Sequence, residues 1–111
     1  MPPIDFNDLD SVVHGPLRLG VLTALQMDGP LAFTTIKKRL GASDGALGQH
    51  LLTLEDVGYI RSTKSFVGRR PKTTYQITRA GRRAFVRYVD AMRQLINTVE
   101  QSWHHERPAS R

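Results

Sequence analysis

One stretch limits the possible folds of this 111-residue chain more than any other: Phe33 to Ile60, FTTIKKRLGASDGALGQHLLTLEDVGYI. Ile36 and Leu40 are four residues apart, so they share one face of a short helix. Gly41 follows directly and supplies the left-handed backbone that commonly ends a helix. The pattern predicts a short helix that stops at a glycine turn.

A second helix is predicted directly after this turn, over about residues 44–57. Ser43 is an N-cap residue type, and Asp44 places a negative charge in the first turn, where the helix dipole favours it. Ala42 and Leu47 have hydrophobic-staple spacing. The inward stripe consists of Leu47, Leu51 and Leu54. The outer face carries small or hydrogen-bonding side chains, Gly45, Ala46, Gln49, His50 and Thr53, and such a face fits a DNA major groove.

A basic β-hairpin is predicted after the second helix, over residues 59–78. Tyr59 to Val67 is expected to form the first strand and Gly68 to Lys72 the turn. Thr73 to Ile77 alternates in the period-two pattern of a half-buried return strand. The turn contains GRRP, whose Pro71 fixes its own φ angle and stiffens the loop.

Helices are also predicted before this central region. A short helix is expected from Asn7 to His14 with Asn7 as its cap, and a second is expected to begin at Pro16. The sequence Asp28-Gly29-Pro30 stops the second helix. Leu31 to Phe33 is either a minor strand or a linker.

A long final helix is predicted from Arg79 to Trp103, with Thr78 as its cap. At 1.5 Å per residue it spans roughly 37 Å, more than a domain of this size needs for its own core. Its apolar residues follow the four-and-three spacing of a heptad seam: Phe85, Val89, Met92, Ile96, Val99 and Trp103. Phe85 and Val89 are also within reach of the helix's own domain.

The seam leads to a prediction of self-association. We assign residues 79–104 to a dimerisation helix and expect the homodimer interface to contain Val89, Met92, Ile96, Val99 and Trp103. Residues 105–111 are expected to form a disordered polar tail. The whole chain, residues 1–111, is expected to be a single domain.

The net charge of +6 is distributed unevenly. Residues 1–58 carry four basic against seven acidic residues, whereas residues 59–111 carry twelve basic against three acidic residues. This asymmetry indicates a polyanion-binding surface built mainly by the second half of the chain. A merely solvated basic surface is the alternative.

Composition also excludes several classes of protein. The chain has no cysteine, which excludes disulfides and thiolate metal sites, and it has no apolar run long enough for a bilayer. The acidic N-terminus is unlike a signal peptide, so a cytoplasmic location is expected. His104 and His105 are adjacent and would point about 100° apart on a helix, so no metal or other cofactor is expected. No catalytic constellation is found, so the chain is not expected to be an enzyme.

Three groups of residues resemble the winged-helix transcriptional regulators of the MarR-like and ArsR-like superfamily: Gln49-His50-Leu51 with Leu54-Glu55, Gly58-Tyr59-Ile60, and Thr78 with Gly81. The resemblance covers roughly Val12 to Val99 and is closest to small stand-alone members. It implies a winged helix-turn-helix, mainly α with a β-hairpin wing. It also implies a homodimer that binds pseudo-palindromic double-stranded DNA and represses transcription.

The chain departs from two branches of this superfamily. It lacks the cysteine clusters of metal-sensing members, and it is shorter than the drug-responsive members that enclose a ligand pocket. A small-molecule effector is therefore not indicated. A ligand near His14, Phe66 or Trp103 remains the alternative to a core or interface role for these residues.

Phosphate contacts and base contacts are predicted from different residues, because phosphates supply affinity and base edges supply specificity. The predicted phosphate contacts are Thr34, Thr35, Ser43, Thr53, Lys64 and Lys72. Lys37 and Lys38 are further candidates, with a solvated helix face as an equal alternative. Arg69 and Arg70, at the predicted wing tip, fit a narrow, electronegative minor groove.

Base reading is predicted from the outer face of the second helix. The Gln49 amide can pair with adenine in a bidentate manner, and His50 can bond guanine or reach a phosphate. Ala46 can touch a thymine methyl, and Gly45 permits close approach. Asp44 could accept from cytosine, but a capping role is favoured.

Two alternatives remain open. A winged-helix protein-interaction module without DNA reading would usually lack the basic wing that this chain has. A binder of RNA or single strands would usually present a platform of exposed aromatic side chains, which is not found here.

Overall fold

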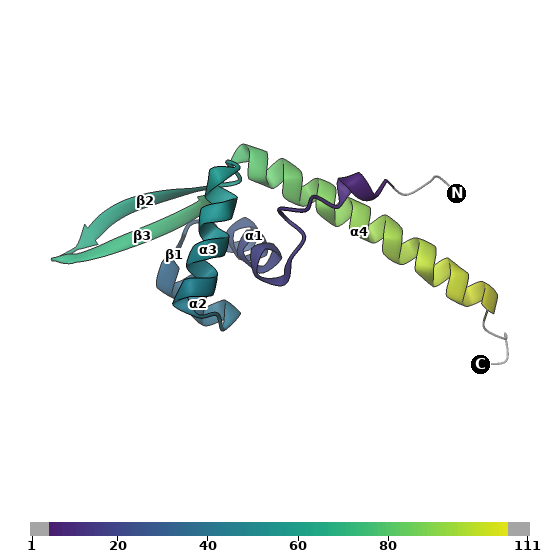
Figure 1. Ribbon diagram of the computed structural model, residues 1–111, viewed down its shortest axis with the longest axis horizontal. Coiled ribbons are helices and arrows are strands. Elements are labelled where there is room, and N and C mark those ends of the chain that lie inside the picture. The colour runs from purple at the N-terminus through teal and green to yellow at the C-terminus, as the bar shows by residue number, and fades with distance from the viewer. Residues whose placement is uncertain (1–4, 107–111) are drawn as a thin grey trace.

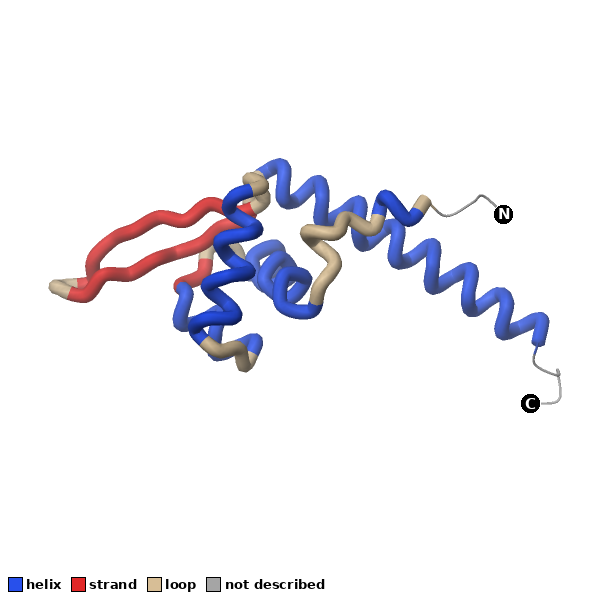
Figure 2. The backbone as a smooth tube through the Cα atoms, viewed as in Figure 1, coloured by secondary structure: helices blue, strands red, loops and turns tan. Residues whose placement is uncertain are grey.

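The computed structural model describes residues 5–106, with side chains described for residues 5–103. Its fold is mainly helical with a β-hairpin wing, as predicted. Three helices form a compact body, and the wing and the last helix project from opposite sides of it (Figure 1; Figure 2). The elements in chain order are η1 (Phe6–Asp8), α1 (Pro16–Asp28), β1 (Leu31–Ala32), α2 (Phe33–Leu40), α3 (Asp44–Asp56), β2 (Ile60–Val67), β3 (Arg70–Ile77) and α4 (Arg79–Glu106).

A single hydrophobic core holds the helical body together. Its fully buried members include Leu22 and Leu25 of α1, Ile36 of α2 and the predicted stripe of α3. Each such side chain contributes about 1.5 to 3 kcal/mol through its removal from water. The core cluster consists of Val13, Val21, Leu22, Leu25, Ile36, Leu47, Leu51, Leu54, Ile60, Ile77, Ala84 and Tyr88.

The predicted start and end of α1, the predicted end of α2 and the predicted cap of α3 are confirmed, whereas α3 ends at Asp56 instead of about residue 57. Gly41 ends α2 with a left-handed φ of 62°. The Ser43 hydroxyl caps α3 by accepting a hydrogen bond from the Ala46 amide at 3.2 Å. Pro16 begins α1, and Gly29 follows its last residue with a φ of 77°. These signals are reliable because each acts within one turn of the residue that carries it.

The sheet has the order β1-β3-β2 and is antiparallel throughout. Leu31 and Ala32 form the minor strand and pair with β3, so the linker alternative is wrong. The predicted turn, Gly68 to Lys72, is too long, because Val67 already pairs with Arg70. Only Gly68 and Arg69 connect the strands, and Gly68 has the positive φ of 64° that suits the first position of a two-residue hairpin turn.

The helix predicted from Asn7 to His14 is wrong. The structure has only the short 3-10 turn η1, capped by Asp5, whose carboxylate accepts from the Asn7 amide at 2.9 Å. Beyond it, the Asp10 carboxylate accepts hydrogen bonds from the amides of Val12 (2.8 Å) and Val13 (3.4 Å). These local bonds compete with helical hydrogen bonds, which explains the irregular backbone.

Asp10 also attaches this N-terminal segment to the base of the wing by accepting a hydrogen bond from the Tyr59 hydroxyl. Burial favours the protonated form of Asp10. The bonds from Tyr59, Val12 and Val13 and the charge of Arg87 outweigh this effect and hold the pKa of Asp10 below its usual value. The same bond, together with burial, raises the pKa of Tyr59.

The end of α3, both wing strands and the start of α4 meet at one junction. The Thr78 hydroxyl caps α4 by accepting from the Gly81 amide at 3.0 Å and donates to the Gly58 carbonyl at 2.6 Å. The Thr78 amide donates to the Tyr59 carbonyl at 3.0 Å. Gly81 packs so closely that a Cβ atom there would lie 2.0 Å from the Tyr59 oxygen. The predicted cap is confirmed.

Helix α4 packs on its own domain through three residues outside the predicted seam and through two residues of the seam itself, Phe85 and Met92. Ala84, Tyr88 and Ala91 are buried, and Phe85 and Met92 are partly buried against the core. The rest of the helix projects, and the Cα radius of gyration is 17.8 Å, compared with roughly 13 Å for a compact domain of this length. Helix α4 ends at Glu106 instead of about residue 104. Residues 107–111 of the predicted tail lie outside the described residues.

Replacing Gly81 by alanine is expected to destabilise the fold. The new methyl group would collide with backbone, and overpacking of this kind costs about 1 to 3 kcal/mol or more. Urea unfolding followed by circular dichroism measures the change. Gly48→Ala is the matched control, because nothing lies within 4 Å of a Cβ there and alanine is the better helix former. Equal stability of the two variants would contradict the packing argument.

The Asp10 bond is expected to make stability sensitive to acid. Because the folded-state pKa of Asp10 lies below the usual aspartate value of 3.8, its contribution to stability is present above that value and is lost as the pH falls through the folded pKa. Asp10→Asn and Tyr59→Phe should both be less stable than wild type at pH 6, and the deficit of Asp10→Asn should shrink towards pH 2.5. Urea titrations at several pH values measure this, and a constant deficit would contradict it.

Candidate nucleic-acid interface

The outward face of α3 is open and carries most of the predicted base-reading residues. Asp44, Gly45, Ala46 and Gln49 are exposed, whereas His50 and Thr53 are half-buried. Nothing lies within 4 Å of a Cβ built on Gly45. The face is therefore smooth at its N-terminal end, where another molecule can approach the helix backbone closely.

The charge at the start of α3 is balanced by α2. The Lys37 ammonium lies 2.8 Å from the Asp44 carboxylate, and both side chains are exposed. An exposed pair of this kind adds only about 0 to 1 kcal/mol to stability, but it offsets a negative charge beside the open face. This pairing is a role for Lys37 that differs from both predicted ones, the phosphate contact and the solvated side chain.

The Thr53 hydroxyl is engaged within its own helix. It donates to the Gln49 carbonyl at 3.1 Å, a common arrangement for threonine in a helix. The predicted phosphate contact from Thr53 would need this hydroxyl hydrogen to be released.

His50 is in contact with a residue that the sequence did not single out. Nη1 of Arg18, on α1, lies 3.0 Å from Nδ1 of His50. The same guanidinium donates to the carbonyls of Val12 at 2.5 Å and Ser11 at 3.2 Å. Arg18 belongs to the less basic half of the chain and is 32 positions from His50, so no sequence pattern connected the two.

The wing is basic and contains no acidic residue. Residues 59–78 include five basic residues: Arg61, Lys64, Arg69, Arg70 and Lys72. All five are exposed. The strand register places Arg61, Arg70 and Lys72 on one face and Lys64 on the other. Arg61 was missed as a candidate, although its alternation with Thr63 and Ser65 could have identified it.

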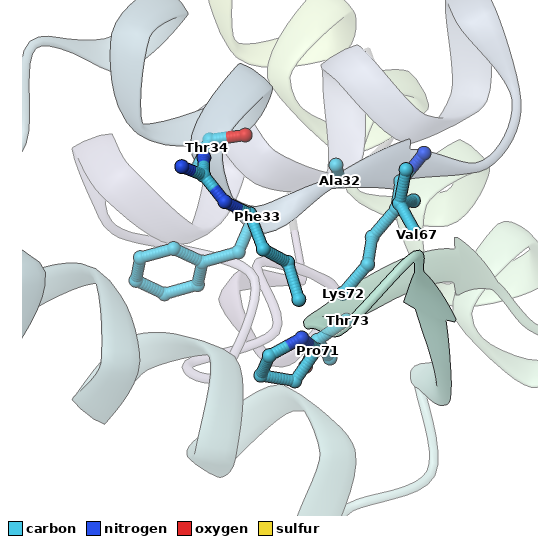
Figure 3. Close-up of a pocket in the computed structure, with 8 residues that line it drawn as sticks. Ala32, Phe33, Thr34, Val67, Pro71, Lys72 and Thr73 are labelled. Carbon is cyan, nitrogen blue, oxygen red and sulfur yellow. The ribbon is translucent and has the colours of Figure 1, made fainter.

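A cavity of about 400 Å³ lies between the wing and the start of α2. Figure 3 shows Thr34 on α2 and Pro71 and Lys72 on β3 among its lining residues. Arg70 also lines it, and the first turn of α2 has no side-chain cap. Two predicted phosphate contacts, Thr34 and Lys72, are therefore brought together here. Thr35 follows on α2 and is half-buried.

The remaining candidate ligand positions serve different structural roles. Phe66 is 73% exposed near the wing tip, so it is not part of the core. His14 contacts the Tyr88 hydroxyl through Nδ1 at 2.7 Å, which links the N-terminal segment to α4. Trp103 is 52% exposed on the projecting part of α4.

The predicted dimer residues lie along α4 on both sides of the point where it leaves the body. Val89 and Met92 are half-buried, whereas Ile96 and Val99 are 50% and 38% exposed. A groove of about 410 Å³ runs between α1 and α4 and is lined in part by Phe85, Val89, Met92 and Ile96.

Among residues 5–103, whose side chains the structure describes, no three histidine or acidic residues are grouped so that they could hold a metal ion. No described helix is both long and apolar enough to span a membrane.

Comparisons with known proteins agree with this geometry. An uncharacterized protein of Methanocaldococcus jannaschii is 33% identical over 89 residues, which cover 80% of this chain and 97% of that protein. A transcriptional regulator homologue from Pyrococcus horikoshii OT3 superimposes with a TM-score of 0.76 at 26% identity, covering 84% of this chain and 93% of the other. A putative transcriptional regulator from Salmonella typhimurium gives 0.68 at 22% identity, covering 91% and 90%.

The family assignment follows from a match over most of the chain. Residues 17–96 match the family described as "Winged helix DNA-binding domain". This span includes α1, the whole of α2 and α3, the wing and much of α4. The chain therefore belongs to the winged-helix DNA-binding domain family and is a small winged-helix regulator of the kind that its sequence resembles.

Proposed function

We propose that this protein is a cytoplasmic, sequence-specific regulator that binds double-stranded DNA as a homodimer and represses transcription. The observation that carries the proposal is the juxtaposition of an open face on α3 with a wing that has five basic residues and no acidic ones. In this arrangement α3 enters the major groove, and the wing follows the backbone and the adjacent minor groove. The proposal includes no metal, cofactor or small-molecule effector.

Base reading is assigned to the exposed end of α3. Gln49 is exposed and can pair with the N6 and N7 atoms of adenine. The open space above Gly45 and the small side chain of Ala46 let the helix enter the groove deeply. Asp44 is not the cap, which is Ser43, but it places a negative charge in the first turn of α3. Its ion pair with Lys37 reduces its repulsion of phosphates.

Backbone contacts are assigned to residues around the cavity between α2 and the wing. The free amides in the first turn of α2 attract anions, because they carry the positive end of the helix dipole. Arg70 and Lys72 line the same cavity. Thr34, Thr35 and Ser43 extend this surface, and Lys64 adds a positive charge on the other face of the wing. Thr53 is a weaker candidate for a phosphate contact because its hydroxyl already donates to the Gln49 carbonyl.

The short wing turn gives the two tip arginines different roles. Arg69 lies in the turn itself, so it reaches furthest from the body and is assigned to the minor groove. Arg70 lies on β3 beside the cavity and is assigned to the backbone. A narrow minor groove concentrates negative potential, so Arg69 would favour A·T-rich flanks.

The homodimer is assigned to α4. Ile96 and Val99 leave apolar surface exposed in the second half of α4. This half of the helix projects from the body (Figure 1). A second copy packed along this seam would cover that surface and would place two α3 helices for the two halves of a pseudo-palindrome. Val89, Met92 and Trp103 lie on the same seam.

Fluorescence anisotropy tests the proposal as a whole. The protein is titrated onto its own upstream promoter DNA and onto a scrambled duplex at 50 and 200 mM salt. Tighter binding to the promoter supports the proposal. If the dimer neutralises about 6 to 10 phosphates, affinity should fall by roughly 10³ to 10⁵ between these salt concentrations. Failure to bind either duplex would favour the protein-interaction alternative.

Variants of the wing and of α3 should change DNA binding in different ways. Arg69→Ala combined with Arg70→Ala should weaken binding to every duplex and flatten its salt dependence, because both side chains are attracted by the charge of the phosphate backbone or of the groove.

Gln49→Ala should instead reduce the preference for promoter over scrambled DNA by about 1 to 3 kcal/mol. An unchanged salt dependence of binding in the double arginine variant would mean that the wing does not contact DNA. Equal losses on both duplexes would contradict base reading by Gln49.

Charges placed in the seam should separate the dimer. Ile96→Asp combined with Val99→Asp buries two carboxylates in the proposed interface, so light scattering should report monomers. Val86→Asp is the matched control, because Val86 is also 50% exposed on α4 but lies outside the seam. A persistent dimer in the double variant would place the interface elsewhere.

A further inference from the structure

The contact between Arg18 and His50 has a consequence for what α3 can recognise. We propose that Arg18 is a positioning residue that holds His50 as a hydrogen-bond donor at Nε2, so that α3 selects guanine at the base that His50 faces. This inference rests on the proposed DNA-binding function, and it assigns to Arg18 a role in specificity without contact with DNA.

The guanidinium of Arg18 is held in place on three sides. Its Nε donates to the Val12 carbonyl at 2.5 Å, and Nη2 donates to the Ser11 carbonyl at 3.2 Å. Nη1 is left to face Nδ1 of His50 at 3.0 Å. Arg18 is half-buried, and its backbone lies in α1, which packs on α3 through the core. Its orientation towards His50 is therefore set by the fold.

Proton chemistry then fixes the state of the imidazole. A guanidinium has five N–H donors and no acceptor, and it stays protonated in proteins. Nδ1 of His50 must therefore accept, which leaves the single proton of a neutral imidazole on Nε2. A protonated imidazole would direct an N–H group at the cation. While the contact persists, the other edge of His50 is a donor only.

The position of His50 makes this donor useful. His50 follows the exposed Gln49 and lies one helical turn beyond Ala46, beside the face assigned to the major groove. Guanine presents two acceptors in that groove, N7 and O6, whereas adenine presents one acceptor and one donor. A side chain that can only donate is attracted by both guanine acceptors and repelled by the N6 amino group of adenine, so among the purines it favours guanine. Gln49, which both donates and accepts, suits adenine.

The imidazole state is tested in the free, full-length protein. Long-range ¹H–¹⁵N correlation spectra distinguish protonated from unprotonated ring nitrogens, and loss of one set of signals in His50→Gln assigns His50 among the four histidines. Nδ1 should be unprotonated and Nε2 protonated. In Arg18→Met, which keeps the aliphatic stem and removes the donors, the Nδ1 signal should move towards that of an averaged imidazole. Arg93→Met, on exposed α4 surface, is the control.

Two spectroscopic results would overturn the inference. One is a proton on Nδ1 of His50 in the wild-type protein. The other is a His50 spectrum that is the same in Arg18→Met as in wild type. The wild-type spectrum alone decides the first point, so the test survives even if Arg18→Met does not fold.

Selection of duplexes from a random pool tests the specificity. Wild-type protein should select a guanine in each half-site, and both Arg18→Met and His50→Gln should weaken that preference about tenfold while the preference that depends on Gln49 remains. Uniform weakening on all sequences would mean that His50 meets a phosphate, and would overturn its role in base selection. If wild type binds no duplex, the proposed function fails, and the role in specificity fails with it, whatever the spectra show.

Discussion

The close approach of α4 to the Tyr59 carbonyl is the constraint on which the other parts of the structure depend. Gly81 makes this approach possible, because any side chain there would occupy the space of the Tyr59 oxygen. Thr78 completes the junction with bonds to Gly58 and Tyr59. Helix α3 ends here, strand β2 begins and strand β3 ends here, and the projecting helix α4 starts here. The relative orientation of the three elements with assigned functions is thus set within a few residues.

Local signals in the sequence predicted much of this fold, whereas contacts between residues that are distant in the sequence were not predicted. Gly41, Ser43 and Thr78 identified helix ends correctly because capping acts within one turn. The helix expected near the N-terminus failed because Asp10 bonds to the backbone amides that a helix would use. Of the inner face of α4, the sequence indicated Phe85 but not Ala84 and Ala91. These two side chains are small and do not stand out in a hydrophobic stripe, although small side chains allow close packing there.

The candidate interface shows the same difference between local features, which the sequence predicted, and distant contacts, which it did not. The sequence nominated individual side chains by type and position, and the structure shows Gln49 and the wing cations to be exposed. The side-chain contacts that neutralise or orient residues of this surface could not be predicted. Lys37 reaches Asp44 across a glycine turn, and Arg18 reaches His50 from a different helix. Such pairs change what a surface residue can offer to a partner, and they depend on how the helices pack.

The segment before α1 contacts three separate parts of the molecule. Asp10 bonds to the base of the wing, the carbonyls of Ser11 and Val12 hold Arg18, and His14 reaches Tyr88 on α4. The family match nevertheless begins only at residue 17. A domain boundary drawn at that residue would discard the whole segment. A protein trimmed there would keep nearly all of α1 and every later element, but it would lose the contacts that tie α1, the wing and α4 together.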